Sequence, residues 1–195
     1  MPKRVLIIDG HPDATAERYL HALSAAYRDG ARAGGHDVRG IVVSELEFPL
    51  LRTSEDFRCG TPNEAIRKCQ DDLVWADHVV ILFPLWLGSM PALLKGFLEQ
   101  VLRPGFAFAA AKGRRLPRKL LSGRSVRIIV TMGMPGLFYR WYFRAHGLKS
   151  LERNILGFCG LRPVRACVIG MVESMSQARR GNWLARAHKL GNQAV

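Results

Sequence analysis

Three short stretches of this sequence carry residue types that could hold an anionic ligand with a flat ring. In the first, Thr15 could cap a helix and offer its hydroxyl to a phosphate, and His11 could add a second donor. In the second, Trp86 could pack against a flat ring. An ordinary helix cap at Thr15 and core packing of Trp86 are the alternative interpretations. The stretches span residues 10–18, 84–90 and 131–134.

Each stretch follows a run of apolar, often β-branched residues that predicts a buried strand. The predicted strands span residues 4–9, 38–43, 79–83, 126–131 and 164–169. Apolar residues at helical spacing predict helices at 15–33, 61–76, 91–102, 148–160 and 176–190. Thr61 and Pro62 fit the N-cap and first position of the second helix.

Strands and helices alternate along the chain, which predicts parallel strands joined by right-handed crossovers. We therefore expect an α/β fold, a doubly wound sheet of five strands in the flavodoxin-like order 2-1-3-4-5 with helices on both faces. In such a sheet, ligands bind beyond the carboxyl ends of the strands, where the strand order reverses. No repeat or linker interrupts the pattern, so residues 1–195 are expected to form a single domain.

The composition is that of an ordinary globular protein, with 48% hydrophobic and 23% charged residues. Prolines and a glycine break the longest uncharged apolar run, so we expect no membrane insertion. The N-terminus lacks the apolar stretch of a signal peptide, and the four cysteines show no CxxC spacing. These features predict buried free thiols, no metal site and a cytoplasmic location.

Two common phosphate-binding motifs are absent from the sequence. The first strand is not followed by G-x-G-x-x-G, which argues against a dinucleotide bound in the Rossmann manner. No G-x-x-x-x-G-K-[ST] is present either, which argues against a P-loop NTPase.

Positive charge is concentrated in one part of the chain. The net charge is +13, and residues 112–165 contain 13 basic residues against one acid, Glu152. Such a field attracts anionic cofactors or polyanions, although a solvated face would have the same composition. We do not expect a nucleic-acid partner, because the sequence has no DNA-binding or RNA-binding motif.

The second stretch and its continuation resemble a known family. Phe83 to Phe97, FPLWLGSMPALLKGF, and the following VLRPGFAF at 101–108 resemble the flavodoxin-like NAD(P)H:quinone oxidoreductases, in particular their short bacterial members. The resemblance spans residues 4–190 and is most specific over 84–108. It implies a flavin cofactor, FAD or FMN, with NAD(P)H as co-substrate, and a homodimer whose sites lie at the subunit interface.

The resemblance also assigns cofactor-binding residues. Flavin phosphates would rest on the first loop, the ring would lie against the second loop, and the polar edge of the ring would meet the third. The residues implied are His11, Thr15, Glu17, Arg18, Pro84, Leu85, Trp86, Leu87, Thr131, Met132, Gly133 and Met134.

Two further pairs of residues match catalytic and substrate positions of the family. Tyr139 and His146 would stabilise the negative charge that hydride transfer leaves on the flavin. Packing within an aromatic cluster is the alternative for Tyr139, and a loop position without a role is the alternative for His146. Phe106 and Phe108 resemble the aromatic walls of the substrate pocket, which suit quinone rings.

The function implied is a two-electron reduction of quinones or similar acceptors by NAD(P)H, in ping-pong order. The basic stretch, including Arg114 and Arg115, would draw NAD(P)H to the site. Three alternatives remain: a flavin-binding regulatory subunit of a membrane transporter, a one-electron flavodoxin-type carrier, and a basic nucleic-acid binder. The basic surface and the single hydroxyl of the first loop are untypical of an electron-carrier flavodoxin.

Overall fold

The computed structural model describes residues 1–15, 17–109 and 117–195. Its main sheet has five parallel strands in the order β2-β1-β3-β6-β7. These strands are β1 (Arg4–Asp9), β2 (Asp37–Val42), β3 (His78–Pro84), β6 (Ser125–Thr131) and β7 (Val164–Ile169). Counted along the chain, this is the predicted order 2-1-3-4-5, and each strand lies where the apolar runs predict it.

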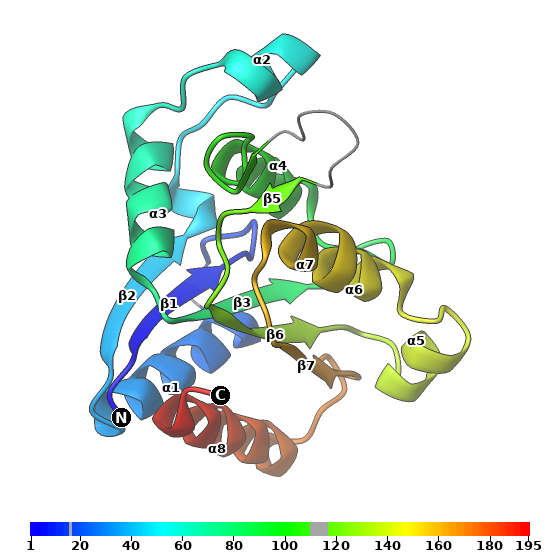
Figure 1. The fold of residues 1–195 in the computed structure, drawn as a ribbon. Helices are drawn as coiled ribbons and strands as arrows, with labels where there is room; N and C mark the ends of the chain where they lie inside the picture. Colours follow the sequence, from blue (N-terminus) through cyan, green and yellow to red (C-terminus); the bar gives the residue numbers. More distant parts are fainter. Residues whose placement is uncertain (16, 110–116) are drawn as a thin grey trace.

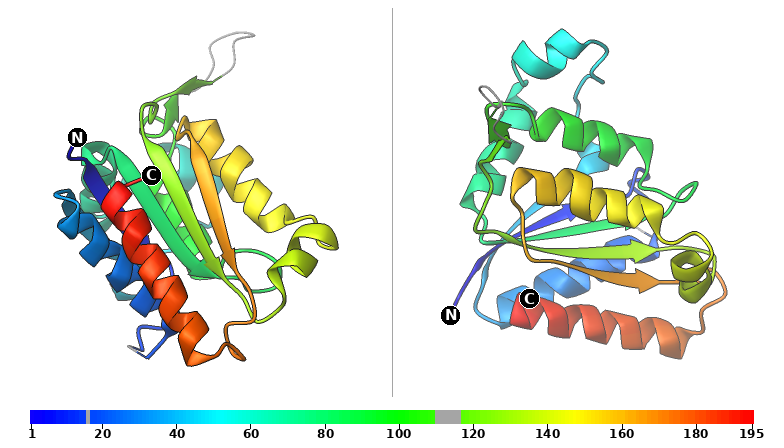
Figure 2. Two further views of the ribbon diagram at one scale, coloured as in Figure 1. Left: turned by 90° about the horizontal axis from the view of Figure 1, so that it is seen from below. Right: turned by 45° about the vertical axis from the view of Figure 1, so that its right-hand side comes forward.

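Helices cover both faces of the sheet, which confirms the doubly wound α/β architecture (Figures 1 and 2). On one face lie α1 and α8. On the other lie α3, α4 and the segment that contains α6 and α7. The bounds are α1 (Tyr19–Ala33), α3 (Glu64–Trp75), α4 (Ala92–Val101), α6 (His146–Lys149), α7 (Gly157–Cys159) and α8 (Gln177–Gln193).

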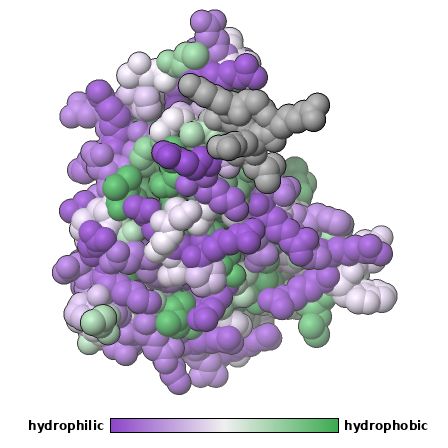
Figure 3. Space-filling model, in the orientation of Figure 1, coloured by the Kyte–Doolittle hydropathy of each residue, from purple (hydrophilic) through white to green (hydrophobic). Residues whose placement is uncertain are grey.

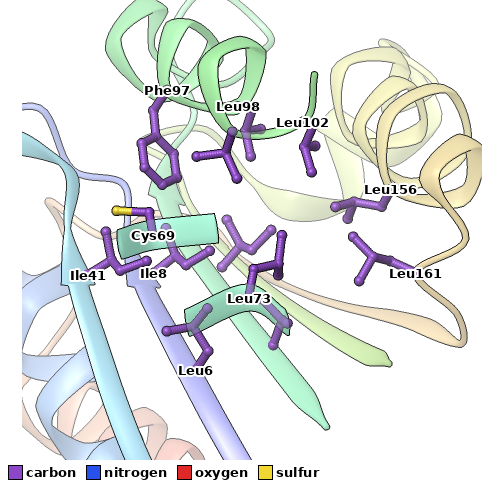
Figure 4. Close-up of a pocket in the computed structure, with 13 residues that line it drawn as sticks. Leu6, Ile8, Ile41, Cys69, Leu73, Phe97, Leu98, Leu102, Leu156 and Leu161 are labelled. Atoms are coloured by element: carbon purple, nitrogen blue, oxygen red, sulfur yellow. The ribbon is translucent and has the colours of Figure 1, made fainter. Parts of the chain in front are cut away.

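The central strands are apolar without alternation because both of their faces are covered. In β3, every residue from His78 to Phe83 is buried. The core between the sheet and α3 and α4 contains a small void, lined by apolar side chains and Cys69 (Figure 4). Its volume is about 10 Å³, near the lower limit for one water molecule, so it is a packing defect and not a ligand site.

Glycines allow α1 and α8 to pack with their backbones in contact. A Cβ atom at Gly30 would lie 1.9 Å from the carbonyl oxygen of His188, and one at Gly191 would lie 2.1 Å from that of Tyr27. Any side chain at these positions would therefore force the two helices apart. By contrast, Gly181 near the start of α8 has no atom within 4 Å of its Cβ position.

Two helix starts differ from the prediction. α1 begins at Tyr19 and not at Thr15, because the Asp13 carboxylate accepts the backbone N–H of Thr15 at 2.9 Å and holds these residues in a turn. Thr15 therefore does not cap the helix. α3 is capped by Asn63 and not by Thr61, because the side-chain oxygen of Asn63 accepts the N–H of Ile66 at 3.0 Å.

The helix predicted at 148–160 from the helical spacing of Leu148, Leu151, Ile155 and Phe158 is present, but only Leu148 and Leu151 of these are buried. Its middle part, η2 (Ser150–Leu156), is π-helical, and a π turn contains an additional residue relative to an α turn. Leu156 and Cys159 are therefore buried, whereas Ile155 is half-buried and Phe158 is 39% exposed.

Segments without a clear sequence pattern contain short elements. They are η1 (Val43–Glu45), α2 (Ser54–Cys59), the pair β4 (Phe108–Ala109) and β5 (Arg118–Lys119), and α5 (Gly136–Trp141). No residue of α2 is buried, so Cys59 is exposed, contrary to the prediction; the other three cysteines are buried. None of the helices in the described part of the chain has the length and apolarity that crossing a membrane requires.

The glycine contacts between α1 and α8 yield a paired prediction. Gly30→Ala should lower the free energy of unfolding by about 1–3 kcal/mol, because overpacking outweighs alanine's better helix propensity. Gly181→Ala meets no neighbour and should raise it by up to about 1 kcal/mol. Urea unfolding of both variants checks this, and equal effects of the two substitutions would contradict the packing argument.

Candidate functional site

The carboxyl ends of three adjacent strands form one edge of the sheet. β3 pairs with β1 on one side and with β6 on the other. Backbone hydrogen bonds tie the segments that leave them: Gly10 N–H donates to Leu82 at 2.8 Å, and Leu85 N–H donates to Thr131 at 2.7 Å. The three loops of interest therefore lie side by side.

A cavity of about 600 Å³ opens at this edge. Small-molecule sites typically measure about 300–1,000 Å³. The predicted residues that line it are His11, Glu17, Arg18, Pro84, Leu85, Trp86, Thr131, Met132 and Gly133. The lining residues that the sequence did not predict are Asp13, Tyr19, Leu20, Val172, Glu173 and Arg180. The predicted cofactor-binding residues outside the lining are Thr15, Leu87 and Met134.

Some of these missed residues come from a fourth segment, which follows β7. Because β7 pairs with β6, its carboxyl end joins the same edge. Met132 N–H donates to Ile169 at 2.9 Å, and Val172 N–H donates to Met132 at 3.2 Å. The predicted strand order already placed the fifth strand beside the fourth, so it was the signal that could have identified this segment.

Arg180 on α8 supplies a cation to the cavity. Its guanidinium carbon lies 4.9 Å from the centre of the Tyr19 ring, and it donates to the carbonyl of Val172 at 2.6 Å. The Tyr19 hydroxyl in turn donates to the Arg180 carbonyl at 2.8 Å. These contacts fix the start of α8 against the start of α1, with Arg18 supplying another cation nearby.

Carboxylates shape the first loop. Asp9 is buried at the end of β1 and accepts the backbone N–H of His11 at 3.2 Å. Asp13 accepts hydrogen bonds from the hydroxyl and N–H of Thr15 and from Arg18, which hold the pKa of its carboxyl well below the usual range. The Thr15 hydroxyl is therefore engaged within the loop.

The second loop presents Trp86 on a tight turn. Trp86 and Ser89 exchange two backbone hydrogen bonds, each of 2.9 Å. The central residues both have positive φ, 47° at Leu87 and 79° at Gly88, which is a strained conformation for leucine. Trp86 is 51% exposed, and its ring meets that of His11 edge to face at 6.5 Å between centres. Trp86 is thus not a core residue.

Tyr139 and His146 do not line this cavity. Tyr139 is buried, and its hydroxyl accepts the N–H of Leu148 at 3.2 Å and lies 3.4 Å from the carbonyl of Gly88. Burial raises the pKa of the Tyr139 hydroxyl. His146 is exposed at the start of α6. Their roles toward a cofactor stay predictions.

Phe106 and Phe108 also lie away from the cavity of their own chain. The segment that contains them joins the end of α4 to the start of β6, at the opposite edge of the sheet. Phe108 packs edge to face on Phe158, with 4.8 Å between ring centres. Both rings line a separate pocket of about 290 Å³ beside α4.

The basic residues between positions 117 and 165, the described part of the basic stretch, are dispersed in the fold. The cations that line the cavity are Arg18 and Arg180, which lie outside that stretch. Arg124 donates to the carbonyls of Leu73 and Val74 at the end of α3, and Arg127 is buried. Hydrophilic residues cover most of the face shown in Figure 3. Lys112, Arg114 and Arg115 lie outside the described residues.

The cavity combines the aromatic rings of Trp86 and Tyr19, imidazole and guanidinium donors, and backbone groups of the third loop. Within the described ranges, no group of three or more His, Cys, Asp or Glu side chains could hold a metal ion. The arrangement suits a flat ring at Trp86 with an anionic group near His11 and the arginines.

Comparisons with known proteins agree with this geometry. An "Uncharacterized NAD(P)H oxidoreductase" of Haemophilus influenzae is 25% identical over 90% of this chain and 87% of its own length. The mouse "Ribosyldihydronicotinamide dehydrogenase [quinone]" is 32% identical over 79% of this chain and 68% of its own. An FMN-dependent NADH-azoreductase from Bacillus anthracis, solved in complex with FMN, superposes with a TM-score of 0.71 at 16% identity, covering 98% of this chain and 97% of its own.

A family model described as the flavodoxin-like fold matches residues 3–190, almost the whole chain. The strand order, the ligand-sized cavity at the carboxyl edge and this match lead to one conclusion: the chain belongs to the flavodoxin-like fold family.

Proposed function

We propose that this protein is a flavin-dependent NAD(P)H oxidoreductase that reduces quinones or similar acceptors by two electrons. The observation that carries the proposal is the cavity at the β1–β3–β6 edge, with an exposed Trp86 on one loop and a polar loop after β1. The relatives named above act on NAD(P)H or quinones by their names, and this chain shares their fold.

The residues present fit a flavin. Trp86, Pro84 and Leu85 form one wall of the cavity, and a planar ring can lie against them. A Cβ atom at Gly133 would find no neighbour closer than 3.6 Å, so the third loop leaves room for a ring edge. The arginines at 18 and 180 match the negative charge of a flavin phosphate.

A flavin held in this cavity would supply the hydride chemistry for a two-electron reduction in ping-pong order. Trp86 and Leu85 would support its ring, and backbone groups of Thr131 to Gly133 would hold its polar edge. His11 offers a ring N–H toward the phosphate side. Tyr139 and His146 would supply hydrogen-bond donors to the edge where negative charge develops.

A homodimer completes the proposal. Phe106 and Phe108 lie away from their own cavity, so a second copy would have to present them as the walls of the acceptor pocket. The buried free thiols suit a cytoplasmic enzyme.

The proposal predicts stoichiometric flavin uptake. Purified protein should show flavin absorbance, or should acquire it on incubation with FMN or FAD, and NADPH or NADH should then bleach it. Absorbance and mass analysis of the released cofactor measure this. Failure to bind either flavin under native conditions would overturn the proposed function.

Trp86→Ala should weaken flavin affinity about tenfold, because it removes the aromatic contact with the ring. It should leave the thermal stability of the apo protein nearly unchanged, since half of the side chain is exposed. Trp141→Ala, at an 82% exposed tryptophan outside the cavity, is the matched control and should change neither quantity. A large loss of apo stability with unchanged affinity would contradict the role of Trp86.

His146→Ala should slow flavin reduction by NAD(P)H about ten- to a thousandfold if His146 supplies a proton or a charge. Tyr139→Phe should slow flavin reduction less. It should also lower the free energy of unfolding by about 1 kcal/mol, because the Tyr139 hydroxyl accepts the N–H of Leu148. Tyr142→Phe, at an exposed hydroxyl, is the control. Unchanged stopped-flow rates in the double variant would show that both roles are misassigned.

A further inference from the structure

His21 is a residue of α1 to which sequence reasoning gave no role, and it lies beneath the first loop. Its Nδ1 is 2.8 Å from the Asp9 carboxylate, and its Nε2 is 2.9 Å from the Asp13 carbonyl oxygen. Both partners are acceptors only, so each ring nitrogen must carry a hydrogen to satisfy them. The hydrogen bonds therefore call for a positively charged imidazolium.

The neighbouring His11 completes this network as a neutral ring. The Asp13 carbonyl oxygen and the Asp13 N–H both lie 3.0 Å from Nδ1 of His11, and the N–H can only donate to it. His11 Nδ1 is then an acceptor, so its proton is on Nε2. Burial, and next the charge on His21, lower the pKa of His11, which agrees with a neutral ring.

His36, which follows the end of α1, differs from His21 in its hydrogen-bond partners. Its Nδ1 accepts the N–H of Lys3, and its Nε2 donates to the Asn192 carbonyl, both at 3.0 Å. One donor and one acceptor suit a neutral histidine. Two acceptors, one of them a carboxylate, distinguish His21.

The charge on His21 matters because acids surround the place where a phosphate would bind. Asp13 and Glu17 line the cavity, and Arg18 is already paired with Asp13 through a 2.6 Å ion pair. Asp9 does not line the cavity, but it accepts the N–H of the lining residue His11, and only 5% of its side chain is exposed. Without a proton on His21, that carboxylate would be unneutralised beside an anionic ligand.

We propose that Asp9 and His21 form a buried ion pair beneath the first loop, and that this pair controls the affinity for the phosphate of a flavin. While His21 is protonated, the pair is neutral and the loop is held by two hydrogen bonds. When His21 loses its proton, the loop loses a bond and the phosphate meets an unpaired carboxylate. The inference rests on the proposed flavin function and identifies both side chains as positioning residues.

The direction of the pH dependence follows from the groups that face His21. These are Asp9 at the end of β1 and Asp13 and His11 in the loop. Burial lowers the pKa of His21, but the hydrogen bonds that His21 donates to Asp9 and to the Asp13 carbonyl outweigh it and raise the pKa above the ordinary value. Apo stability should therefore be highest below about pH 6.5 and fall as the pH rises through the raised value, and flavin affinity should fall over the same rise.

Asp9→Asn removes the charge of the carboxylate and keeps its hydrogen bonds to His11 and His21. The amide can still accept from His11 N–H and can donate to His21 Nδ1, so His21 becomes neutral with its proton on Nε2. Isothermal titration with FMN should show wild-type affinity falling about ten- to a hundredfold between pH 7 and 9.5, and a flat profile for Asp9→Asn. The phosphate of FMN is fully ionised over this range, since its second pKa is about 6.

His21→Gln should bind FMN weakly at every pH in this range, because it leaves Asp9 unpaired. Adding Asp9→Asn to it should restore most of the affinity, a rescue that a purely structural role of His21 would not produce. His36→Gln is the matched control and should bind as the wild type does. Equal pH profiles in wild type and Asp9→Asn, or wild-type affinity in His21→Gln, would overturn the inference.

A measurement on the apo protein separates this inference from the proposed function. In ¹⁵N-histidine-labelled apo protein at pH 6.5, both nitrogens of His21 should give protonated signals, with the assignment made by their loss in His21→Gln. A singly protonated His21 would overturn the ion pair whether or not flavin binds. A protonated His21 in a protein that binds no flavin would support the pair and overturn the proposed function.

Discussion

The arrangement of the site depends on one buried carboxylate. Asp9 ends the strand at which the sheet order reverses, and a carboxylate buried there must be neutralised and hydrogen-bonded. It receives the N–H of His11 and a ring N–H of His21, so it fixes both the direction in which the chain leaves β1 and the position of the start of α1. The loop of the candidate phosphate site follows from these two contacts.

The same edge gathers three further segments because the strands are parallel and adjacent. Backbone hydrogen bonds from Leu85 to Thr131 and from Val172 to Met132 set their spacing. The strained turn at Leu87 and Gly88 then turns Trp86 out of the core and toward His11. Strain of this kind persists where the surroundings hold it, which agrees with a binding role for this loop.

The opposite end of the molecule serves stability. Backbone contact at Gly30 and Gly191 locks α1 to α8, and so holds the helix that carries His21 against the helix that carries Arg180. His78 is buried between Tyr27 and Ser125, and burial lowers its pKa to about 3, so it is a neutral core residue. His78 on β3 contacts hydroxyls, whereas the half-buried His21 on α1 contacts a carboxylate and a carbonyl, so the two sets of hydrogen-bond partners call for opposite protonation.

The sequence by itself determined the five strands, their order and the three loops that carry Trp86, His11 and Thr131, because apolar runs and alternation with helices depend on neighbours along the chain. It did not determine the cap of α1, where Asp13 displaced Thr15, or the buried face of the helix after Gly147, which a π-helical segment rotated. Arg180 and the pairing of Asp9 with His21 were decided by the tertiary structure alone, whereas the predicted strand order could have identified the segment of Val172. Contacts between residues far apart in the chain, and the charge that each buried group must carry, leave no periodic signal in the sequence.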